Sequence, residues 1–307
     1  MGSILIIKLS ALGDLVQVSG TMRDIREHHP DDHITIMTMP RYQRLMEKCP
    51  WVDDILLDPR ASRLNIPEML KLRKRIRAGN FQRVYDLQQK SRTRFYYRFL
   101  FPHDVEWCGD IKGGLVYLKQ DEVKTSAPER LARFLRLASI EVKHTLNNDV
   151  SWMADPVEDI LSAAGLNGDY IVLIPGASAV HPEKRWPYFK ELATRLEAQG
   201  YQVVTVPGPD ELDLCKSIPG IMLVPGEGYY DYFKLAGILK NASYVVGNDT
   251  GPTQIAANLG CRGLALYSGF LAPERTGIQF SRLSWLQSDD LADLDIDDVY
   301  EQVINAV

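Results

Sequence analysis

Uninterrupted apolar runs recur along this chain, separated by stretches with a helical period. Runs without polar alternation are typical of strands buried on both faces, as in parallel sheets covered by helices. The first half contains five such runs, the last of them weaker: Ile4–Leu9, Ile34–Met39, Asp54–Leu57, Arg83–Leu87 and Val105–Cys108. The second half contains five more: Tyr170–Ile174, Tyr201–Val206, Ile221–Val224, Tyr244–Gly247 and Gly263–Tyr267. We expect each run to form a strand.

The segments between these runs are amphipathic and predict helices. Examples are Leu15–His28, Pro187–Gln199 and Tyr232–Lys240. Two successive series of alternating strands and helices predict an α/β protein with two doubly wound sheets. An irregular polar stretch at 147–155 separates the series, so we expect one domain over residues 1–150 and another over 151–307. Ligands bind such sheets beyond the carboxyl ends of the strands, so the turns that follow the strands are the candidate sites.

Composition narrows the class of protein. The 307 residues are 45% hydrophobic and 24% charged, as in ordinary globular proteins, and a formal net charge of −5 argues against a general nucleic-acid binder. The four cysteines form no CxxC pair, so we expect reduced, buried thiols in a cytoplasmic protein. The first apolar run is too short to cross a bilayer and lacks the features of a signal peptide.

The turn after the first predicted strand carries the first candidate group. Lys8–Leu15 opens the first predicted helix, and Gly13 allows a backbone conformation that other residues resist. Asp14 then lies near a helix N-terminus, where carboxylate oxygens accept backbone N–H bonds. Two interpretations stay open on these residues alone. Asp14 is either a helix cap or a general base at the active site.

A basic loop after the first strand of the second half predicts an anion site. Ile174–Ser178 is a turn of small residues, and the backbone and the Ser178 hydroxyl can donate hydrogen bonds. Lys184 and Arg185 follow, just before a predicted helix start at Pro187. Positive charge is unfavourable at a helix N-terminus, so the pair predicts a bound anion that compensates. The alternative is a solvated basic pair.

Two further strand ends are compatible with a nucleotide ligand. The segment 247–254 leads from a strand into a helix, so the amides of Thr250 and Gly251 can point at a diphosphate, while Asp249 calls for a cation or for sugar hydroxyls. The segment 206–211 ends in two acidic residues, and a carboxylate at such a strand end often binds ribose hydroxyls; a solvated loop carboxylate is the alternative. The glycine-rich fingerprints of dinucleotide-binding dehydrogenases and of P-loop enzymes are both missing from the sequence.

Four segments, in this order and at this spacing, resemble glycosyltransferase family 9, the ADP-heptose:lipopolysaccharide heptosyltransferases. The first is Ile4–Asp14 (ILIIKLSALGD) and the second is Val84–Gln88 (VYDLQ). The third joins PGAS and KRWP within 175–187, and the fourth, 248–267, opens with NDTG and closes with ALY. The resemblance extends over nearly the whole chain.

This resemblance implies the GT-B architecture, in which two doubly wound parallel-sheet domains face each other across a cleft. Residues 1–150 would bind the acceptor, residues 151–307 would bind the nucleotide-sugar donor, and the last helix could cross back to the first domain. The implied reaction is an inverting, metal-independent transfer of a heptose or similar sugar from an ADP-sugar to an acceptor hydroxyl, in lipopolysaccharide inner-core assembly. No cofactor is expected beyond the nucleotide-sugar co-substrate, ADP-heptose.

The resemblance also assigns roles by position. Asp14 matches the family's catalytic base, and Lys184 matches the lysine that binds the diphosphate and sugar. The acidic pair at 210–211 would supply the ribose-binding carboxylate, and Tyr230 would contact the adenine. Gln254 departs from the family, which usually has histidine there; glutamine can donate a hydrogen bond to a phosphate but cannot carry a proton. The full expected donor-binding set is Ser178, Lys184, Asp210, Glu211, Tyr230, Asp249, Thr250, Gly251 and Gln254.

Basic residues in the first half indicate the acceptor. Arg60, Arg63 and Arg92 follow predicted strands, and we expect them to bind an anionic glycolipid such as the phosphorylated inner core of lipopolysaccharide. A solvated basic face is the alternative. An acceptor of this kind implies a cytoplasmic enzyme that makes peripheral contact with the inner face of the cytoplasmic membrane.

Three other functions are compatible with the same residues. The first is a glycosyltransferase of the same fold with another nucleotide sugar, or with a protein or another glycan as acceptor. The second is a nucleotide-sugar binding protein without catalysis, an alternative that is plausible because Gln254 stands where the family usually has histidine. The third is a sugar epimerase, which would need no acceptor site.

Overall fold

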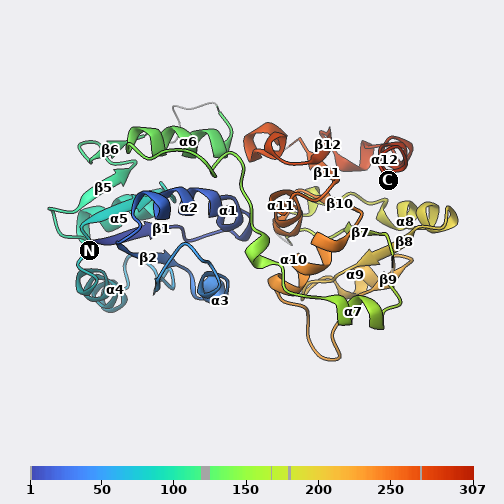
Figure 1. Cartoon of the computed structure of the whole chain (residues 1–307), viewed down its shortest axis with the longest axis horizontal. Helices are drawn as coiled ribbons and strands as arrows, with labels where there is room; N and C mark the ends of the chain where they lie inside the picture. Colours follow the sequence, from blue (N-terminus) through green and yellow to red (C-terminus); the bar gives the residue numbers. More distant parts are fainter. Residues whose placement is uncertain (1, 119–124, 167, 179–180, 270–271) are drawn as a thin grey trace. The chain divides into compact units, whose positions relative to one another are not determined.

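The computed structural model describes residues 2–118, 125–166, 168–178, 181–269 and 272–307. The chain forms two compact units, Met1–Asn148 and Asp149–Val307. The sequence pattern placed the domain boundary at residue 150, two residues from this division. Each unit is a parallel sheet with helices on both faces (Figure 1).

Unit 1 contains six parallel strands in the order β3-β2-β1-β4-β5-β6. The strands are β1 (Ser3–Ile7), β2 (His33–Thr38), β3 (Asp54–Leu57), β4 (Arg83–Asp86), β5 (Glu106–Gly109) and β6 (Val116–Tyr117). The helices are α1 (Leu12–Gln17), α2 (Ser19–His28), α3 (Gln43–Glu47), α4 (Ile66–Ala78), α5 (Ser91–Phe99) and α6 (Ala127–Leu137). Helices α4 and α5 cover one face, where Leu72 and Tyr96 pack with Leu5 and Ile7. The order of the strands reverses between β1 and β4, so the loops after these two strands flank the expected ligand position.

Unit 2 repeats this plan with the order β12-β11-β10-β7-β8-β9. The strands are β7 (Tyr170–Ile174), β8 (Gln202–Thr205), β9 (Ile221–Met222), β10 (Tyr244–Asn248), β11 (Gly263–Ser268) and β12 (Leu283–Ser288). The helices are α7 (Glu158–Ala163), α8 (Phe189–Ala198), α9 (Leu212–Lys216), α10 (Tyr232–Asn241), α11 (Gly251–Asn258) and α12 (Ile296–Ile304). The reversal falls between β7 and β10, so the loops after these strands flank the second expected ligand position.

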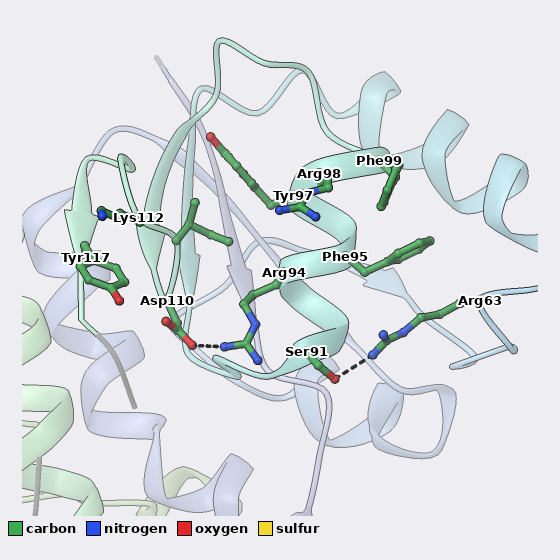
Figure 2. Close-up of a pocket in the computed structure, with 11 residues that line it drawn as sticks. Arg63, Ser91, Arg94, Phe95, Tyr97, Arg98, Phe99, Asp110, Lys112 and Tyr117 are labelled. Atoms are coloured by element: carbon green, nitrogen blue, oxygen red, sulfur yellow. Dashed lines mark hydrogen bonds and ion pairs between the residues drawn. The ribbon is translucent and has the colours of Figure 1, made fainter. Parts of the chain in front are cut away.

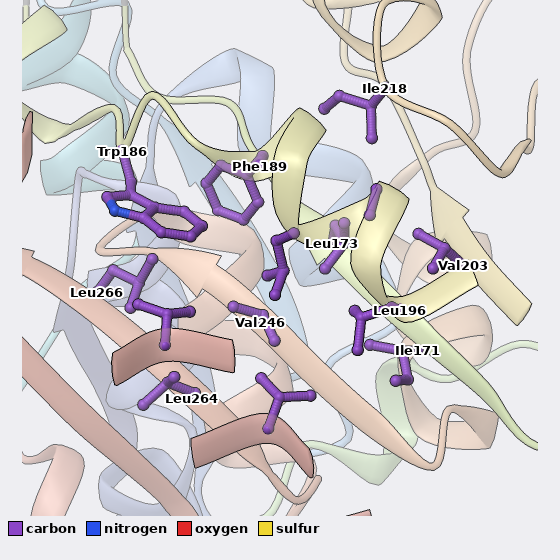
Figure 3. Packing of buried hydrophobic residues seen from close by; sticks show 14 of the residues in the cluster. Ile171, Leu173, Trp186, Phe189, Leu196, Val203, Ile218, Val246, Leu264 and Leu266 are labelled. Atoms are coloured by element: carbon purple, nitrogen blue, oxygen red, sulfur yellow. The ribbon is translucent and has the colours of Figure 1, made fainter. Parts of the chain in front are cut away.

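The core of unit 2 lies between the sheet and helices α8 and α12. Figure 3 shows Trp186 and Phe189 against Leu266 and other strand residues. Val299 and Val303 of α12 belong to the same buried cluster. The last helix, which the family resemblance allowed to cross back to the first domain, therefore packs on α8 in its own unit.

All ten predicted strands are present, and the predicted α/β fold with two doubly wound parallel sheets is confirmed. Strands β6 and β12 were not expected. Both lie at sheet edges, and β12 is buried at only one of its six residues, so it lacks the apolar run of an inner strand. The predicted helix Leu15–His28 is also divided at Val18.

The division of that helix lies beside Gly20, which contacts residues far away in the sequence. A Cβ atom on Gly20 would lie 2.3 Å from the carbonyl oxygen of His144, so only glycine fits there. The Gly20 amide donates to the Asn148 side chain at 2.6 Å, and this bond caps the start of α2 from outside the helix. Long-range packing thus overrides the helical period.

Two further observations describe the units. All four cysteines are buried and unpaired thiols. Within the described ranges, no helix has the length and apolar character needed to cross a membrane.

Candidate active site

The loop after β1 presents an exposed carboxylate held beside a buried lysine. The Lys8 ammonium lies 3.2 Å from an Asp14 carboxylate oxygen, and the side chains are 9% and 51% exposed. Asp14 is the third residue of α1, and it also accepts a bond from the Ala11 amide at 3.3 Å. Burial lowers the pKa of Lys8, and the neighbouring Asp14 opposes this shift. Asp14 is therefore both a helix cap and an accessible carboxylate, so the two interpretations of this residue are compatible.

The motif VYDLQ holds that loop in place. The side-chain oxygen of Gln88 accepts bonds from the amides of Leu9 and Ser10 at 2.9 and 3.4 Å. Asp86, which is fully buried, accepts bonds from the Gln88 and Gln89 amides at 3.1 and 2.9 Å. Burial raises the pKa of Asp86 to about 6. The motif is thus a scaffold beneath the loop that carries Lys8 and Asp14.

Arg130 of α6 is a third charged group at this edge, and the sequence reasoning missed it. Its guanidinium donates to the Gln89 side chain at 2.8 Å. Burial lowers the pKa of Arg130, and the charge of Asp14 opposes that shift. The Arg130 charge also acts on Lys8. A single arginine in an amphipathic helix carries no sequence signal that would place it beside a turn more than a hundred residues earlier.

The three arginines expected to bind the acceptor occupy different surroundings. Arg60 is exposed, has a left-handed φ of 54°, and donates to the Ser10 hydroxyl at 3.4 Å. Arg63 is exposed and donates to the Ser91 hydroxyl at 2.9 Å. Arg92 is 12% exposed and lies 3.4 Å from the fully buried Asp58 carboxylate.

Asp58 organises the loop that carries Arg60. It accepts the Arg60 amide at 2.7 Å, pairs with Arg92, and accepts the hydroxyl of Tyr96. Arg92 further donates to the Ala61 carbonyl at 2.9 Å. Arg92 therefore supports the loop, whereas Arg60 lies on the side of the Asp14 loop and is the residue better placed to meet a ligand.

In unit 2 the central feature is an ion pair between Lys184 and Asp249. Their charged atoms are 2.6 Å apart, and the side chains are only 18% and 12% exposed. Asp249 directly follows β10, and Lys184 ends a short 3-10 turn, Pro182–Lys184, after β7. Lys184 is therefore the cation beside Asp249, where the sequence predicted either a cation or sugar hydroxyls.

This pair corrects the expectation for the basic dipeptide. Helix α8 begins at Phe189, four residues after Arg185, so the basic residues do not lie at its N-terminus. The Arg185 guanidinium instead donates to the Ala177 carbonyl at 2.8 Å. Within the protein, the charge of Lys184 is balanced by the Asp249 carboxylate.

Asn248 joins the loops of this edge and was also missed. It is fully buried, accepts the Trp186 amide at 3.1 Å, and donates to the carbonyls of Pro175 and Gly176 at 2.9 and 3.3 Å. Its own carbonyl accepts the Thr253 hydroxyl at 2.6 Å. One amide side chain thereby fixes the segments PGAS, KRWP and NDTG relative to one another.

The start of α11 lies beside the pair. Thr250 is the N-cap and Gly251 the first helical residue, and the first amides of a helix have no partner within it. Gln254 lies one turn further and is only 6% exposed. Its side chain hydrogen-bonds the buried Tyr267 hydroxyl, which lies 3.0 Å from the Thr276 hydroxyl. The glutamine therefore contacts Tyr267 of β11.

The remaining donor-side residues lie on neighbouring loops. Glu211 accepts the Gly208 amide at 2.9 Å and lies so close to Gly176 that a Cβ there would be 1.6 Å from its carboxylate. Asp210 and Ser178 are exposed. Tyr230 is partly exposed, and its loop is tied to the Asp210 loop by a bond from Tyr229 to the Pro209 carbonyl at 2.9 Å. Glu211 is thus the acidic residue that contacts the PGAS loop.

The part of the chain that the structure describes contains no cluster of three or more His, Cys, Asp or Glu side chains suited to a metal ion.

Solved structures with this fold include glycosyltransferases. A family 9 glycosyltransferase from Veillonella parvula DSM 2008 is 22% identical, with a TM-score of 0.79 over 99% of this chain and 95% of that one. E. coli ADP-heptose lps heptosyltransferase II is 20% identical, with a TM-score of 0.72 over 100% and 98%. E. coli heptosyltransferase WaaC with ADP-2-deoxy-2-fluoro heptose is 16% identical, with a TM-score of 0.73 over 99% of each chain. A comparison with curated protein sequences gave no significant match.

These structures share the GT-B fold of two parallel sheets with this chain. The model of glycosyltransferase family 9 (heptosyltransferase) matches residues 69–290, and the chain belongs to this family. The family resemblance seen in the four motifs is thereby confirmed.

Proposed function

We propose that this glycosyltransferase moves a heptose or a similar sugar from an ADP-sugar to an acceptor hydroxyl, with inversion and without a metal ion. The observation that carries the proposal is the Lys184–Asp249 pair beside the first amides of α11. A lysine and helix amides are the groups that stabilise a diphosphate. The family and the two E. coli heptosyltransferases support ADP-heptose as the donor.

The proposed chemistry divides between the two units. The acceptor oxygen attacks the anomeric carbon from the face opposite the diphosphate, and the bond from that carbon to the diphosphate oxygen breaks. Asp14 takes the proton of the acceptor hydroxyl, a role typically worth about 10²–10⁴-fold in rate. ADP leaves with the bonding electron pair, and Lys184 with the amides of Thr250 and Gly251 stabilises its charge.

The proposed donor site uses the loops around Asn248. Ser178 would donate to the diphosphate, and Glu211 or Asp210 would accept the ribose hydroxyls. Tyr230 would contact the adenine. Support for this assignment is that the loops after β7 and β10 flank the strand-order reversal of unit 2, where nucleotides bind such sheets, and that Glu211 lies against Gly176 of the first of these loops.

The proposed acceptor is an anionic glycolipid, in the assembly of the inner core of lipopolysaccharide. Arg60 and Arg63 are exposed cations at the carboxyl edge of unit 1 and would bind its phosphate or carboxylate groups. Arg92 would act through Asp58 by holding the Arg60 loop. An enzyme with this acceptor would work in the cytoplasm, in peripheral contact with the inner membrane surface.

A ligand panel and a transfer assay test the proposal. Thermal unfolding should shift upward with ADP and ADP-heptose more than with UDP-, GDP- or CMP-sugars, because a ligand stabilises by RT ln(1 + [L]/Kd). Transfer of heptose to a truncated glycolipid should then be visible by mass spectrometry and should survive EDTA. A larger upward shift of the unfolding temperature with another nucleotide sugar would mean that this other sugar nucleotide, and not ADP-heptose, is the donor. An enzyme silenced by EDTA and restored by Mg²⁺ would contradict the metal-independent mechanism.

A further inference from the structure

Unit 1 carries a pocket of about 600 Å³ that shares Arg63 with the proposed acceptor site and is otherwise lined by residues that the proposed chemistry does not use (Figure 2). One wall is the outer face of α5, where Ser91, Arg94 and Arg98 recur at helical spacing. The other wall is the connection from β5 to β6, with Lys112 and Tyr117. Arg63, from the loop between β3 and α4, completes the lining.

The charge of this pocket is opposite to that of the whole chain. Its lining contains four cations, Arg63, Arg94, Arg98 and Lys112, and a single carboxylate, Asp110, a net charge of +3. The chain as a whole has a net charge of −5. Asp110 is 6% exposed and is neutralised by Arg94 at 2.5 Å, which leaves the other three cations to set the local potential. A concave cationic surface on an acidic protein selects an anionic ligand and orients it.

Exposed apolar side chains surround these cations. Phe99 is 55% exposed, Tyr117 42%, and Leu115, which precedes β6 by one residue, 54%. Phe95 stacks with Phe99 at 4.9 Å between ring centroids, and the Arg63 guanidinium lies 5.6 Å from the Phe95 ring. Leu64, the residue after Arg63, is 88% exposed.

A soluble anion would need the cations but not this apolar rim. Exposed apolar patches on soluble proteins mark interaction sites, and basic residues mixed with aromatic and aliphatic ones are typical of surfaces that lie on anionic membranes. We propose that the outer face of α5 and the β5–β6 connection form a docking site for an anionic phospholipid bilayer. Arg98 and Lys112 would contact lipid phosphates, and Phe99, Leu115 and Tyr117 would enter the headgroup layer. This inference rests on the proposed function for the membrane contact and adds the surface that makes it; it does not depend on the donor or on the transfer chemistry.

Vesicle binding of the whole chain tests the proposal. The probes are vesicles of phosphatidylcholine alone and of equal parts phosphatidylcholine and phosphatidylglycerol, in a sedimentation or fluorescence assay. Wild type should bind the mixed vesicles and not the neutral ones. The double variant R98Q/K112Q should bind the mixed vesicles roughly 30-fold more weakly, from the contribution of one basic residue near an anionic surface applied twice. Neither residue belongs to the proposed catalytic machinery, so transfer to a soluble acceptor should be unchanged.

A matched control removes the same charge elsewhere in unit 1. Arg133 and Arg136 are exposed on α6, so R133Q/R136Q should bind mixed vesicles like wild type. F99S keeps the charge and should weaken binding most at high salt, where screening leaves the apolar contacts dominant. Equal vesicle binding by R98Q/K112Q and wild type would overturn the proposal, as would an equal loss in R133Q/R136Q. Saturable binding of glycerol phosphate that R98Q/K112Q abolishes, without vesicle binding, would show that the pocket takes a soluble anion instead.

Discussion

The two units carry similar lysine–aspartate pairs with opposite accessibility. In unit 1 the lysine is covered and the carboxylate is exposed: Lys8 is 9% and Asp14 51% accessible, at 3.2 Å. In unit 2 both partners are covered: Lys184 is 18% and Asp249 12% accessible, at 2.6 Å. Both pairs follow strands at the reversal of strand order in their sheet.

This difference separates the chemistry of the two edges. A carboxylate that stays exposed while a buried lysine balances its charge can meet an incoming hydroxyl, which suits a general base. A lysine that a carboxylate positions in a covered site can donate a charge-assisted hydrogen bond to a diphosphate, which suits donor binding.

The buried residues that support the two pairs also differ, in whether they can titrate. Asp86 supports the loop of unit 1 and Asn248 joins the loops of unit 2, and both are fully buried. The first is a titratable carboxyl group and the second a neutral amide. Unit 1 should therefore respond to pH through its scaffold, and unit 2 should not.

Asp14→Asn should have the largest effect on activity. Asparagine keeps the size and the cap but cannot take a proton, so turnover should fall by about 10²–10⁴-fold. Donor binding should stay unchanged, because Asp14 lies at the acceptor-side edge. Steady-state kinetics and ADP titration of the same variant measure both quantities. Wild-type turnover in D14N would remove Asp14 from the reaction.

Asn248→Asp should convert the scaffold of unit 2 into that of unit 1. The second carboxylate oxygen would face the carbonyls of Pro175 and Gly176, which now accept bonds from the Asn248 amide. A buried charge without a partner costs about 3–5 kcal/mol, so unfolding near neutral pH should be that much easier. Denaturant unfolding measures it. The destabilisation should shrink in acid, and a loss independent of pH would point to altered packing instead.

Asp86 should give unit 1 a pH-dependent stability. Its folded pKa of about 6 lies above the usual value of 3.8. Below pH 4 both states are protonated and nothing is lost. As pH rises from about 4 to 6 the unfolded chain releases the proton first, so stability falls by about 3 kcal/mol and then stays level.

The variant D86N isolates this effect. Asparagine can still accept the Gln88 and Gln89 amides but does not titrate. Denaturant unfolding at several pH values should show wild type losing stability against D86N between pH 4 and 6. Parallel pH profiles of the two proteins would mean that Asp86 ionises normally.

How far the sequence predicted this molecule depends on the range of the interaction. Buried strands such as β7 were predicted residue for residue, because apolar runs are local signals. The polar side chains that connect the loops at the carboxyl end of each sheet were not predicted. Arg130 reaches Gln89 from 41 positions away, and Asn248 reaches Pro175 from 73.

The candidate site shows the same limit. Motif resemblance found Lys184 and Asp249 but could not show that they pair with each other. It also placed Arg92 with Arg60 and Arg63, although Arg92 is held by Asp58 inside the unit. Charge alone cannot distinguish a cation that meets a ligand from one that supports a loop.

Gln254 should have the smallest effect. Its side chain contacts Tyr267, which also has Thr276 as a partner, so Gln254→Ala should cost about 1 kcal/mol of stability. Histidine can make the same contact, and Gln254→His should keep turnover. Thermal unfolding and kinetics of the two variants check this. If Gln254→Ala left stability unchanged but abolished ADP binding, the glutamine would be a direct ligand of the donor.

The central claim is that unit 2 binds the diphosphate through Lys184 while unit 1 supplies the base. Calorimetric titration of ADP into wild type, D14N and K184A tests it most directly. D14N should bind like wild type, and K184A should bind more weakly by about 1.5–3 kcal/mol, roughly ten- to hundredfold, because a charged partner of the diphosphate is lost. Equal ADP affinity in K184A and wild type would contradict the account.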